Sequence, residues 1–351
     1  MHRSYRRRFA GTGVAICLLV ALAPSLHAGI SIQANYTDAA GVGFNDATDG
    51  ALRQSAFEYA LDIWGNALAP RYLGETITID AKFDSLSAGT LANAAATSNW
   101  NLNTSNKLVY ASAVANHIVG YDLDASESEG YATFNSNENW YYGTDNAAPG
   151  GEYDFVAIAL REIGHALGFA GSLYYNASDT GDPDNGQYDA DVISRLTNGN
   201  DDSGAERYNH YDFYVGRLNG DGSYTQLVDL TAAERIAAAI SDNLYWGGAE
   251  AFAANGDAYP KLYAPLTWQQ GSSYSHLDET TFALELMSPT YTTGTPHALS
   301  DLTIAMMVDM GWDAAPVPEP GTLAVWSVLA VGVSFSRRRR RGSVRSHGEA
   351  A

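Results

Sequence analysis

Cysteine is nearly absent from the chain, which has a single thiol, Cys17. This residue lies in an apolar run over residues 14–23, which follows four arginines and precedes a small-residue stretch that ends at Ala28. The arrangement predicts an export signal peptide over residues 1–28, with an uncleaved anchor as the alternative. Because its removal takes Cys17 away, we expect the exported chain to lack disulfides, cysteine-ligated zinc and a cysteine nucleophile.

Basic residues are also scarce in the central segment of the chain, residues 29–315, which we call the core region. Residues 29–315 hold 10 of the 20 Lys+Arg but 38 of the 40 Asp+Glu, which is a formal charge of −28. A surface of this sign repels nucleic acid and anionic membranes, so nucleic acid is not an expected partner and contact with a membrane is expected only through the C-terminal tail. It suits a soluble exported protein or one that binds calcium, and the core contains no phosphate-binding loop and no Ser-His-Asp signature.

No apolar run reaches the roughly 20 residues that span a bilayer. The longest near the C-terminus, residues 321–336, follows a Pro-rich linker with Pro318-Glu319-Pro320 and precedes five arginines. It predicts a short tilted transmembrane stretch or a transient anchor, with the arginines on the cytoplasmic side. This order of features over residues 316–351 resembles the bacterial PEP-CTERM sorting signal. The resemblance implies an exosortase-type sorting enzyme as partner, removal of the tail, and delivery to the cell surface or extracellular matrix; a chance Pro-Glu-Pro before an ordinary anchor is the alternative.

The core over residues 29–315 has the length of one large domain or of two subdomains, at about 29–171 and 172–315. Alternating apolar residues predict strands, and apolar residues at helical spacing predict helices. The strands are expected at 29–36, 75–84 and 131–137, and the helices at 51–68, 108–119, 155–167, 231–239 and from Ser300 to Trp312. The alternation in the first half predicts an α+β fold with a twisted, mainly parallel sheet and an antiparallel edge at 131–137, followed by a loop-rich C-terminal subdomain.

The motif in the 155–167 helix lacks its first metal ligand. Residues 159–172 read ALREIGHALGFAGS, which would contain the HExxH helix of zinc peptidases if residue 161 were histidine. In that helix two histidines four residues apart bind the metal, and the glutamate between them acts as general base on the bound water. Glu162 and His165 are present here, whereas Arg161 stands at the first ligand position.

A second segment supplies a candidate for the remaining ligand. His276 lies 111 residues after His165 and eleven before Met287, and this spacing resembles the third-ligand and Met-turn region of leishmanolysin-like metzincins. The likeness extends to ATFNSN, EYDFVAIALREIGHALGF, PKLYAPLTWQQGSSYSHLDE and LSDLTIAMMVDMGW, a combination that resembles exported bacterial leishmanolysin-type metallopeptidases. It implies a zincin fold and zinc-dependent cleavage of peptides that lie along a sheet edge, with Glu162 as base, His165 and His276 as ligands and Met287 beneath the metal.

Arg161 places that activity in question. A guanidinium has no lone pair for a metal and repels a cation. We expect it to form an ion pair with Glu162, which would give a folded, metal-free relic. Three alternatives stay open: the recorded arginine is a strain variant or sequence error, since its codon is one base from histidine; Arg161 swings out and a two-histidine zinc site remains; or a replacement ligand comes from among Asp179, Asp182, Asp184 and His210.

Two other functions compete with peptidase activity. One is a non-catalytic pseudopeptidase that binds an extended peptide or protein at the cell surface by strand addition. The other is a structural role in the matrix that needs no cleft.

A few further residues are weaker candidates. Tyr291 is a candidate to stabilise a reaction intermediate, and the alternative is that it only packs in the protein interior. An acidic loop binds calcium or is solvated, although it lacks the terminal Glu of an EF-hand. The remaining histidines are expected to be hydrogen-bonded structural residues. The acidic loop residues are Asp179, Asp182, Asp184, Asp189 and Asp191, and the histidines are His117, His210 and His297.

Overall fold

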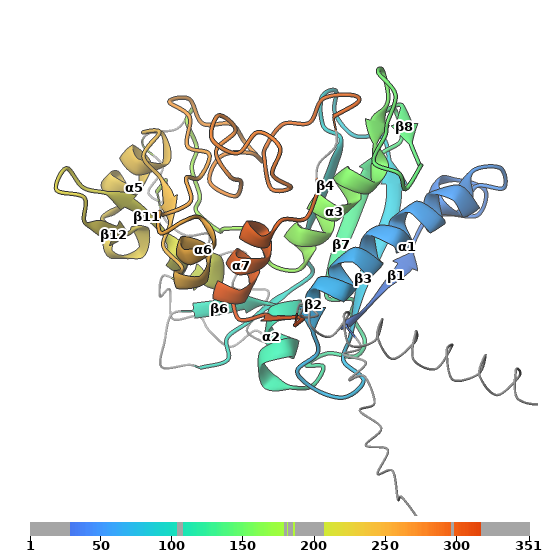
Figure 1. Ribbon diagram of the computed structural model, residues 1–351, viewed down its shortest axis with the longest axis horizontal. Coiled ribbons are helices and arrows are strands. Elements are labelled where there is room, and N and C mark those ends of the chain that lie inside the picture. The colour runs from blue at the N-terminus through green and yellow to red at the C-terminus, as the bar shows by residue number, and fades with distance from the viewer. Residues whose placement is uncertain are drawn as a thin grey trace, which may run out of the picture.

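The computed structural model of the chain describes residues 29–103, 108–178, 181, 185–186, 207–295 and 298–316 (Figure 1). Several predicted features lie outside these residues: the signal peptide, the sorting tail with Pro318, Glu319 and Pro320, all five aspartates of the acidic loop, and His297. Within the described part, no helix combines the length and apolar character needed to cross a membrane.

A four-stranded sheet forms the centre of the first half, and the fold is mixed α+β. Its strands are β1 (Ser31–Tyr36), β3 (Thr76–Asp84), β7 (Gly130–Asn135) and β4 (Ala92–Ala96), in the order β1-β3-β7-β4. The first three run parallel, whereas β4 pairs antiparallel with β7. In β3 every second residue from Ile77 to Ala81 is buried, as the apolar alternation predicts.

Two long helices, α1 (Gly50–Ala67) and α3 (Phe155–Ala166), pack against each other and against this sheet (Figure 1). The indole Nε1 of Trp64 donates a hydrogen bond to the carbonyl of Leu160 at 2.8 Å and thereby ties α1 to α3. Asp154 caps α3, because its side chain accepts from the backbone N–H of Ala157 at 3.0 Å. The cap and the two packed neighbours fix the helix that carries the REIGH motif.

Two parts of the predicted topology are wrong. Residues 108–111 form strand β6 (Leu108–Ala111), and only α2 (Ser112–Val119) is helical, because β6 pairs with β5 (Asn99–Trp100) and β10 (Tyr208–Asn209). The predicted strand at 131–137 exists as β7, but it pairs parallel with β3 in the sheet interior. The antiparallel edge is β4, whose alanine-rich sequence carries almost no strand preference of its own.

Shorter elements build the rest of the molecule. The predicted helix at 231–239 is α5 (Ala232–Ala239), with the expected capping box of Thr231 and Glu234, and the last predicted helix is α7 (Asp301–Asp309) after its cap Ser300. The other elements are β2 (Leu68–Ala69), β8 (Trp140–Tyr141), β9 (Tyr153–Asp154), β11 (Val215–Leu218), β12 (Tyr224–Gln226), β13 (Tyr245–Trp246), β14 (Asp313–Ala314), α6 (Ala249–Ala254), and the 3-10 helices η1 (Gly43–Asn45), η2 (His210–Tyr214) and η3 (Leu227–Asp229).

Candidate functional site

Two histidines that lie far apart in the sequence face each other in the structure. His165 is in the last turn of α3, and His276 belongs to the long segment between α6 and α7. Their Nε2 atoms are 3.2 Å apart, and the side chains are nearly inaccessible, with 7% and 3% of each residue exposed. The fold therefore brings together the two histidines that the sequence proposed as ligands of one metal.

The other nitrogen of each ring faces a backbone carbonyl. Nδ1 of His165 lies 2.6 Å from the carbonyl oxygen of Phe169, and Nδ1 of His276 lies 2.8 Å from that of Ser272. A carbonyl oxygen only accepts, so each Nδ1 carries the hydrogen, and a neutral ring then presents its lone pair at Nε2. Burial lowers the pKa of both imidazoles, and the charge of Arg161 acts in the same direction on both.

Arg161 holds the glutamate of the motif in an ion pair. Its Nε and Nη2 both donate to Oε1 of Glu162, at 2.9 and 2.8 Å, and the Glu162 side chain is only 1% exposed. A third donor, Nη1, reaches the carbonyl of Pro289 at 3.4 Å. Burial lowers the pKa of Arg161, but the charge and hydrogen bond of Glu162 together with Tyr291 raise it above its usual value. The ion pair predicted from the sequence is confirmed.

These residues do not fit a zinc site. Catalytic zinc takes three protein ligands and keeps a fourth position for water. Here two imidazoles meet a guanidinium, and no group of three or more His, Cys, Asp or Glu side chains suited to a metal occurs among the described residues. His210, one proposed replacement ligand, instead contacts the carbonyl of Met310 at 3.1 Å, and burial lowers its pKa to about 4. The other proposed replacements, Asp179, Asp182 and Asp184, lie outside the described residues.

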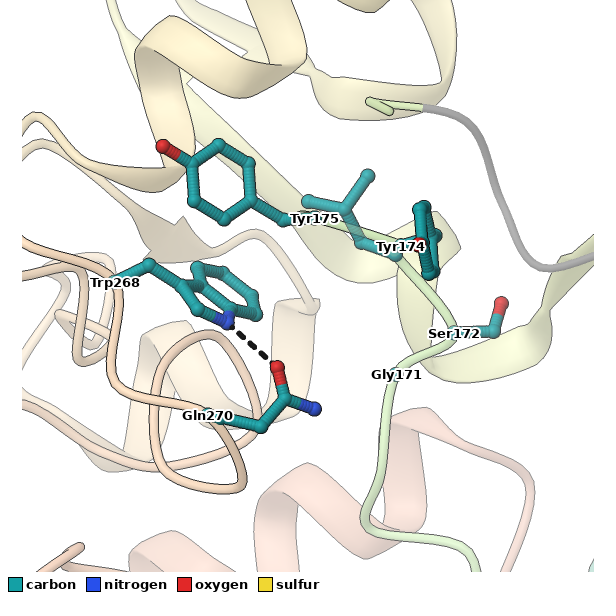
Figure 2. Close-up of a pocket in the computed structure, with 7 residues that line it drawn as sticks. Gly171, Ser172, Tyr174, Tyr175, Trp268 and Gln270 are labelled. Atoms are coloured by element: carbon teal, nitrogen blue, oxygen red, sulfur yellow. Dashed lines mark hydrogen bonds between the residues drawn. The ribbon is translucent and has the colours of Figure 1, made fainter. Parts of the chain in front are cut away.

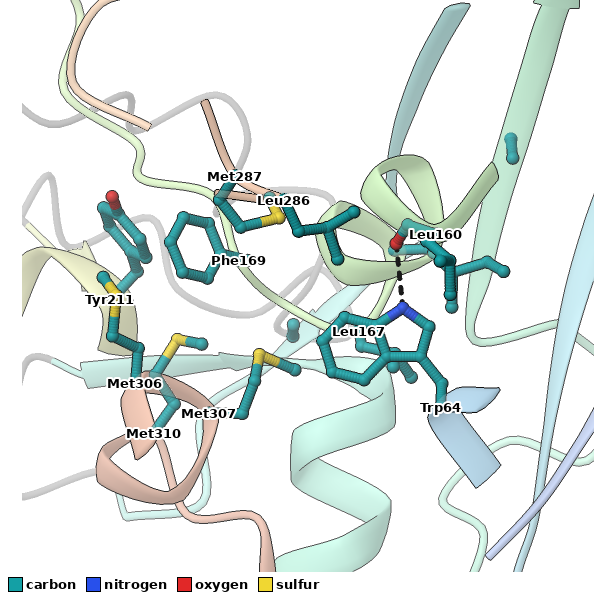
Figure 3. Close-up of a cluster of buried hydrophobic side chains, with 14 of the residues drawn as sticks. Trp64, Leu160, Leu167, Phe169, Tyr211, Leu286, Met287, Met306, Met307 and Met310 are labelled. Carbon is teal, nitrogen blue, oxygen red and sulfur yellow. Dashed lines mark hydrogen bonds between the residues drawn. The ribbon is translucent and has the colours of Figure 1, made fainter. Parts of the chain in front are cut away.

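Met287 is fully buried and packs beside α3 (Figure 3), against Gly164, the residue before His165. A Cβ atom at Gly164 would come within 3.1 Å of its Sδ and 3.2 Å of the Trp64 ring, so glycine permits this approach. The Met287 carbonyl accepts from the N–H of Leu277 at 2.8 Å, which joins the methionine segment to the residue after His276. Met287 therefore packs against the turn that carries His165 and is hydrogen-bonded to the segment that carries His276.

Tyr291 has a packing role in this arrangement. Its ring lies under the guanidinium of Arg161, with 5.0 Å from the Arg161 Cζ to the ring centroid. Its hydroxyl donates to the carbonyl of Leu286, and burial raises its pKa. The hydroxyl of Tyr291 is thus bound to the backbone, while its ring packs against the guanidinium of Arg161.

A buried carboxylate that was not predicted from the sequence, Asp212, holds the His276 segment. Asp212 has no exposed surface and accepts hydrogen bonds from the N–H and hydroxyl of Ser172, the N–H of Asn209 at 2.8 Å and the hydroxyl of Tyr274 at 2.7 Å. Tyr274, two residues before His276, has a φ of 78°, a left-handed conformation that is unfavourable for a side chain of this size. Asp212 therefore stabilises a strained turn next to the histidine. The N-x-x-D pattern from Asn209 to Asp212 was the available sequence signal.

We expect the stability of the protein to fall as the pH rises and Asp212 loses its proton. Burial raises its pKa to about 6 from the ordinary 3.8, although hydrogen bonds from Ser172 and Tyr274 oppose this shift. Between these two values the folded state binds a proton that the unfolded state has released, so the free energy of unfolding falls with rising pH. From about pH 4.5 to about pH 7, the titration of Asp212 should lower the free energy of unfolding by about 2 kcal/mol, measured by urea unfolding. The comparison is with Asp212→Asn, which has no proton to release; the same pH dependence in both proteins would contradict the assignment.

An aromatic pocket lies between the segment that follows α3, residues 171–175, and the segment that carries Trp268 and Gln270 (Figure 2). It has a volume of about 220 Å³, and the rings of Tyr175 and Trp268 lie 5.0 Å apart at its wall. Gln270 accepts from the Trp268 indole at 3.0 Å through its amide oxygen, and its amide NH₂ points away from the indole, toward Gly171 (Figure 2). At the other wall, Gly171 donates its N–H to Ser275 at 3.1 Å, next to His276. The pocket is thus suited to an apolar or aromatic group with a nearby hydrogen-bond acceptor.

Comparisons with known proteins add no family to this description. The sequence was compared with protein-family models and with curated proteins, and neither comparison produced a match.

Proposed function

We propose that this chain is an exported, surface-sorted pseudopeptidase with a leishmanolysin-like metzincin ancestry, which binds peptides or proteins without hydrolysing them. One observation carries the proposal: two donors of Arg161 occupy the same carboxylate oxygen of Glu162. The residue that would act as general base is engaged by a permanent cation. That cation also stands where the first metal ligand would be, so it blocks both the metal and the base of the hydrolytic reaction.

The surroundings of the blocked centre support a binding role. The pocket lined by Trp268 and Tyr175 accepts one apolar or aromatic side chain. Edge strand β4 packs against α3, and in the described sheet its outer side offers backbone N–H and C=O groups for strand addition. The core charge of −28 favours a basic peptide. The proposed ligand is therefore an extended, lysine- or arginine-rich segment with an aromatic anchor residue.

Replacing Trp268 with alanine should weaken peptide binding by about 10-fold or more, because truncation of a buried aromatic anchor contact typically removes 1–3 kcal/mol of binding free energy. The probe is a fluorescent lysine-rich peptide with one central phenylalanine, and the measurement is its dissociation constant by fluorescence anisotropy. A peptide with alanine in place of phenylalanine should bind the wild type weakly. Tyr121→Ala, which removes an exposed tyrosine in the turn after α2, is the matched control and should change nothing. Equal binding by the wild type and Trp268→Ala would contradict the anchor pocket.

One observation favours a second candidate, an active zinc endopeptidase whose arginine moves away from the centre. The two Nε2 atoms already converge on one point, as ligands of one metal do. That function would require a further ligand in place of Arg161. Elemental analysis of the purified protein distinguishes the two candidates: about one zinc per chain together with casein cleavage supports the peptidase, and a zinc-free, inert protein supports the pseudopeptidase.

A further inference from the structure

Strand β1 lies at the border of the central sheet, opposite to β4 (Figure 1). It pairs with β3 on one side, and among the described strands none pairs with its other side. Proteins commonly protect an edge strand from other chains with charged side chains, proline, a bulge or a very short length. The sequence of β1, SIQANY, has no charge and no proline, and its pairing with β3 is continuous over six residues. The outer edge of β1 therefore carries none of these protections.

Backbone hydrogen bonds show which residues of β1 face β3. Ser31, and Thr37 directly after the strand, donate their N–H groups to the carbonyls of Glu75 and Ala81. In a parallel pair, every second residue directs both its N–H and its C=O to the neighbouring strand. The odd-numbered residues of β1 are therefore bound to β3.

The even-numbered residues Ile32, Ala34 and Tyr36 direct their N–H and C=O groups away from β3. Ile30, just before the strand, follows the same alternation, because its N–H donates to the carbonyl of Leu68 at 3.1 Å. Leu68 begins β2 and closes the edge before Ile32, and the strand ends at Tyr36. The stretch available for pairing thus runs from Ile32 to Tyr36 and is centred on Ala34.

This stretch is complementary to an antiparallel copy of itself. When Ala34 stands opposite its counterpart in a second copy, Ile32 stands opposite Tyr36 and Gln33 opposite Asn35. The first pair joins two apolar side chains on the face covered by α1, and the second joins two uncharged amides on the exposed face. The outward backbone groups then form about six hydrogen bonds between the copies. A shift by one residue would place Ile32 opposite Asn35 and lose this match.

Charge determines how such an association depends on salt. The core region carries −28, so two copies repel each other at long range. The edge itself has no charged side chain, so no like charges meet at the contact. Added salt screens the long-range repulsion and should strengthen the association. A basic peptide bound to the same edge would show the opposite dependence.

We propose that β1 is a dimerisation edge, at which two copies of this chain join their sheets antiparallel around Ala34. The dimer contains one continuous sheet in the order β4-β7-β3-β1-β1-β3-β7-β4. Both β4 edges remain free at its two ends, so a dimer presents two copies of the proposed peptide site and gains avidity for a repetitive partner. Dimerisation does not depend on peptide binding, and the two proposals can fail separately.

Sedimentation velocity of the full chain at increasing protein concentration tests the proposal. We expect a monomer–dimer equilibrium that is tighter in about 0.5 M than in about 0.05 M salt. Ala34→Pro leaves the pairing with β3 intact, because the Ala34 N–H faces outward, but it removes the central hydrogen bonds between the copies. It should weaken dimerisation by at least about 10-fold. Ala34→Ser keeps the N–H and should dimerise like the wild type.

Cysteine cross-linking tests the register and does not require the proline variant to fold. All proteins carry Cys17→Ser, so the only thiol is the introduced one. In the proposed dimer, Gln33 and Asn35 form a pair with about 4.5 Å between Cα atoms, which a disulfide can bridge. A mixture of Gln33→Cys and Asn35→Cys proteins should therefore oxidise to a covalent dimer. Either protein alone should form much less, because identical positions are offset diagonally by roughly 7–8 Å.

Four results would overturn the proposal. The first is a folded wild type that is monomeric at every concentration tested. The second is a dimer that Ala34→Pro leaves unchanged while near-ultraviolet circular dichroism shows that the variant is folded. The third is cross-linking of either cysteine protein alone that equals cross-linking of the mixture. The fourth is an association that weakens as salt is added, which would assign the contact to charged surfaces elsewhere.

Discussion

Arg161→His is expected to give a protein that holds about one zinc per chain and cleaves casein at least about 100-fold faster than the wild type, which we propose is inert. The substitution supplies the missing imidazole on the face of α3 that carries His165, four residues away. It also removes both hydrogen bonds that hold Oε1 of Glu162, so the carboxylate becomes available as a general base. Metal content by elemental analysis and casein cleavage are measured on the same samples.

Two matched variants show whether the gain in zinc binding and casein cleavage comes from the new ligand or from the release of Glu162. Arg161→Gln frees Glu162 without providing a ligand, so it should neither retain zinc nor cleave casein. The double variant Arg161→His with Glu162→Gln should hold zinc but cleave poorly, because the metal-bound water then has no base beside it. The pseudopeptidase interpretation fails if the wild type itself holds stoichiometric zinc and cleaves casein. If Arg161→His is folded but remains empty, the scaffold does not have the geometry that the metzincin resemblance implies.

Asp212→Ala is expected to have the largest effect on stability, with a loss of about 4 kcal/mol or more in the free energy of unfolding. The substitution removes the acceptor of four hydrogen bonds, which come from the N–H and hydroxyl of Ser172, the N–H of Asn209 and the hydroxyl of Tyr274. It also releases the left-handed turn at Tyr274, beside His276. Urea unfolding followed by tryptophan fluorescence measures the change.

Ser172→Ala is the control for this experiment. It removes one hydroxyl donor but leaves the carboxylate and its other contacts, so the expected loss is about 1 kcal/mol. If Asp212→Ala loses no more than Ser172→Ala, the carboxylate does not organise this region. The His276 segment would then owe its position to packing against Met287 and the surrounding aromatic residues.

Local patterns were sufficient for most of the first half of the fold. Strand β3 and helices α1 and α3 were predicted from apolar spacing, and α5 from its capping box, because these signals depend on residues within one or two turns. The ion pair between Arg161 and Glu162 was equally local, since the two residues are adjacent on one helix. Strand β4 was missed because its sequence, ANAAA, shows no strand preference.

The sequence by itself determined the chemistry available to this protein. It supplies an excess of acidic residues over 29–315, Arg161 at the first ligand position of the motif, and a helix that carries Glu162 and His165. The tertiary structure decided how that chemistry is arranged. It placed His276 against His165 across 111 residues, buried Asp212 beneath the neighbouring turn and put β4 at the sheet edge. These features depend on contacts between distant segments, and no periodicity within a single segment encodes such contacts, because their free energy arises only when both partners are folded.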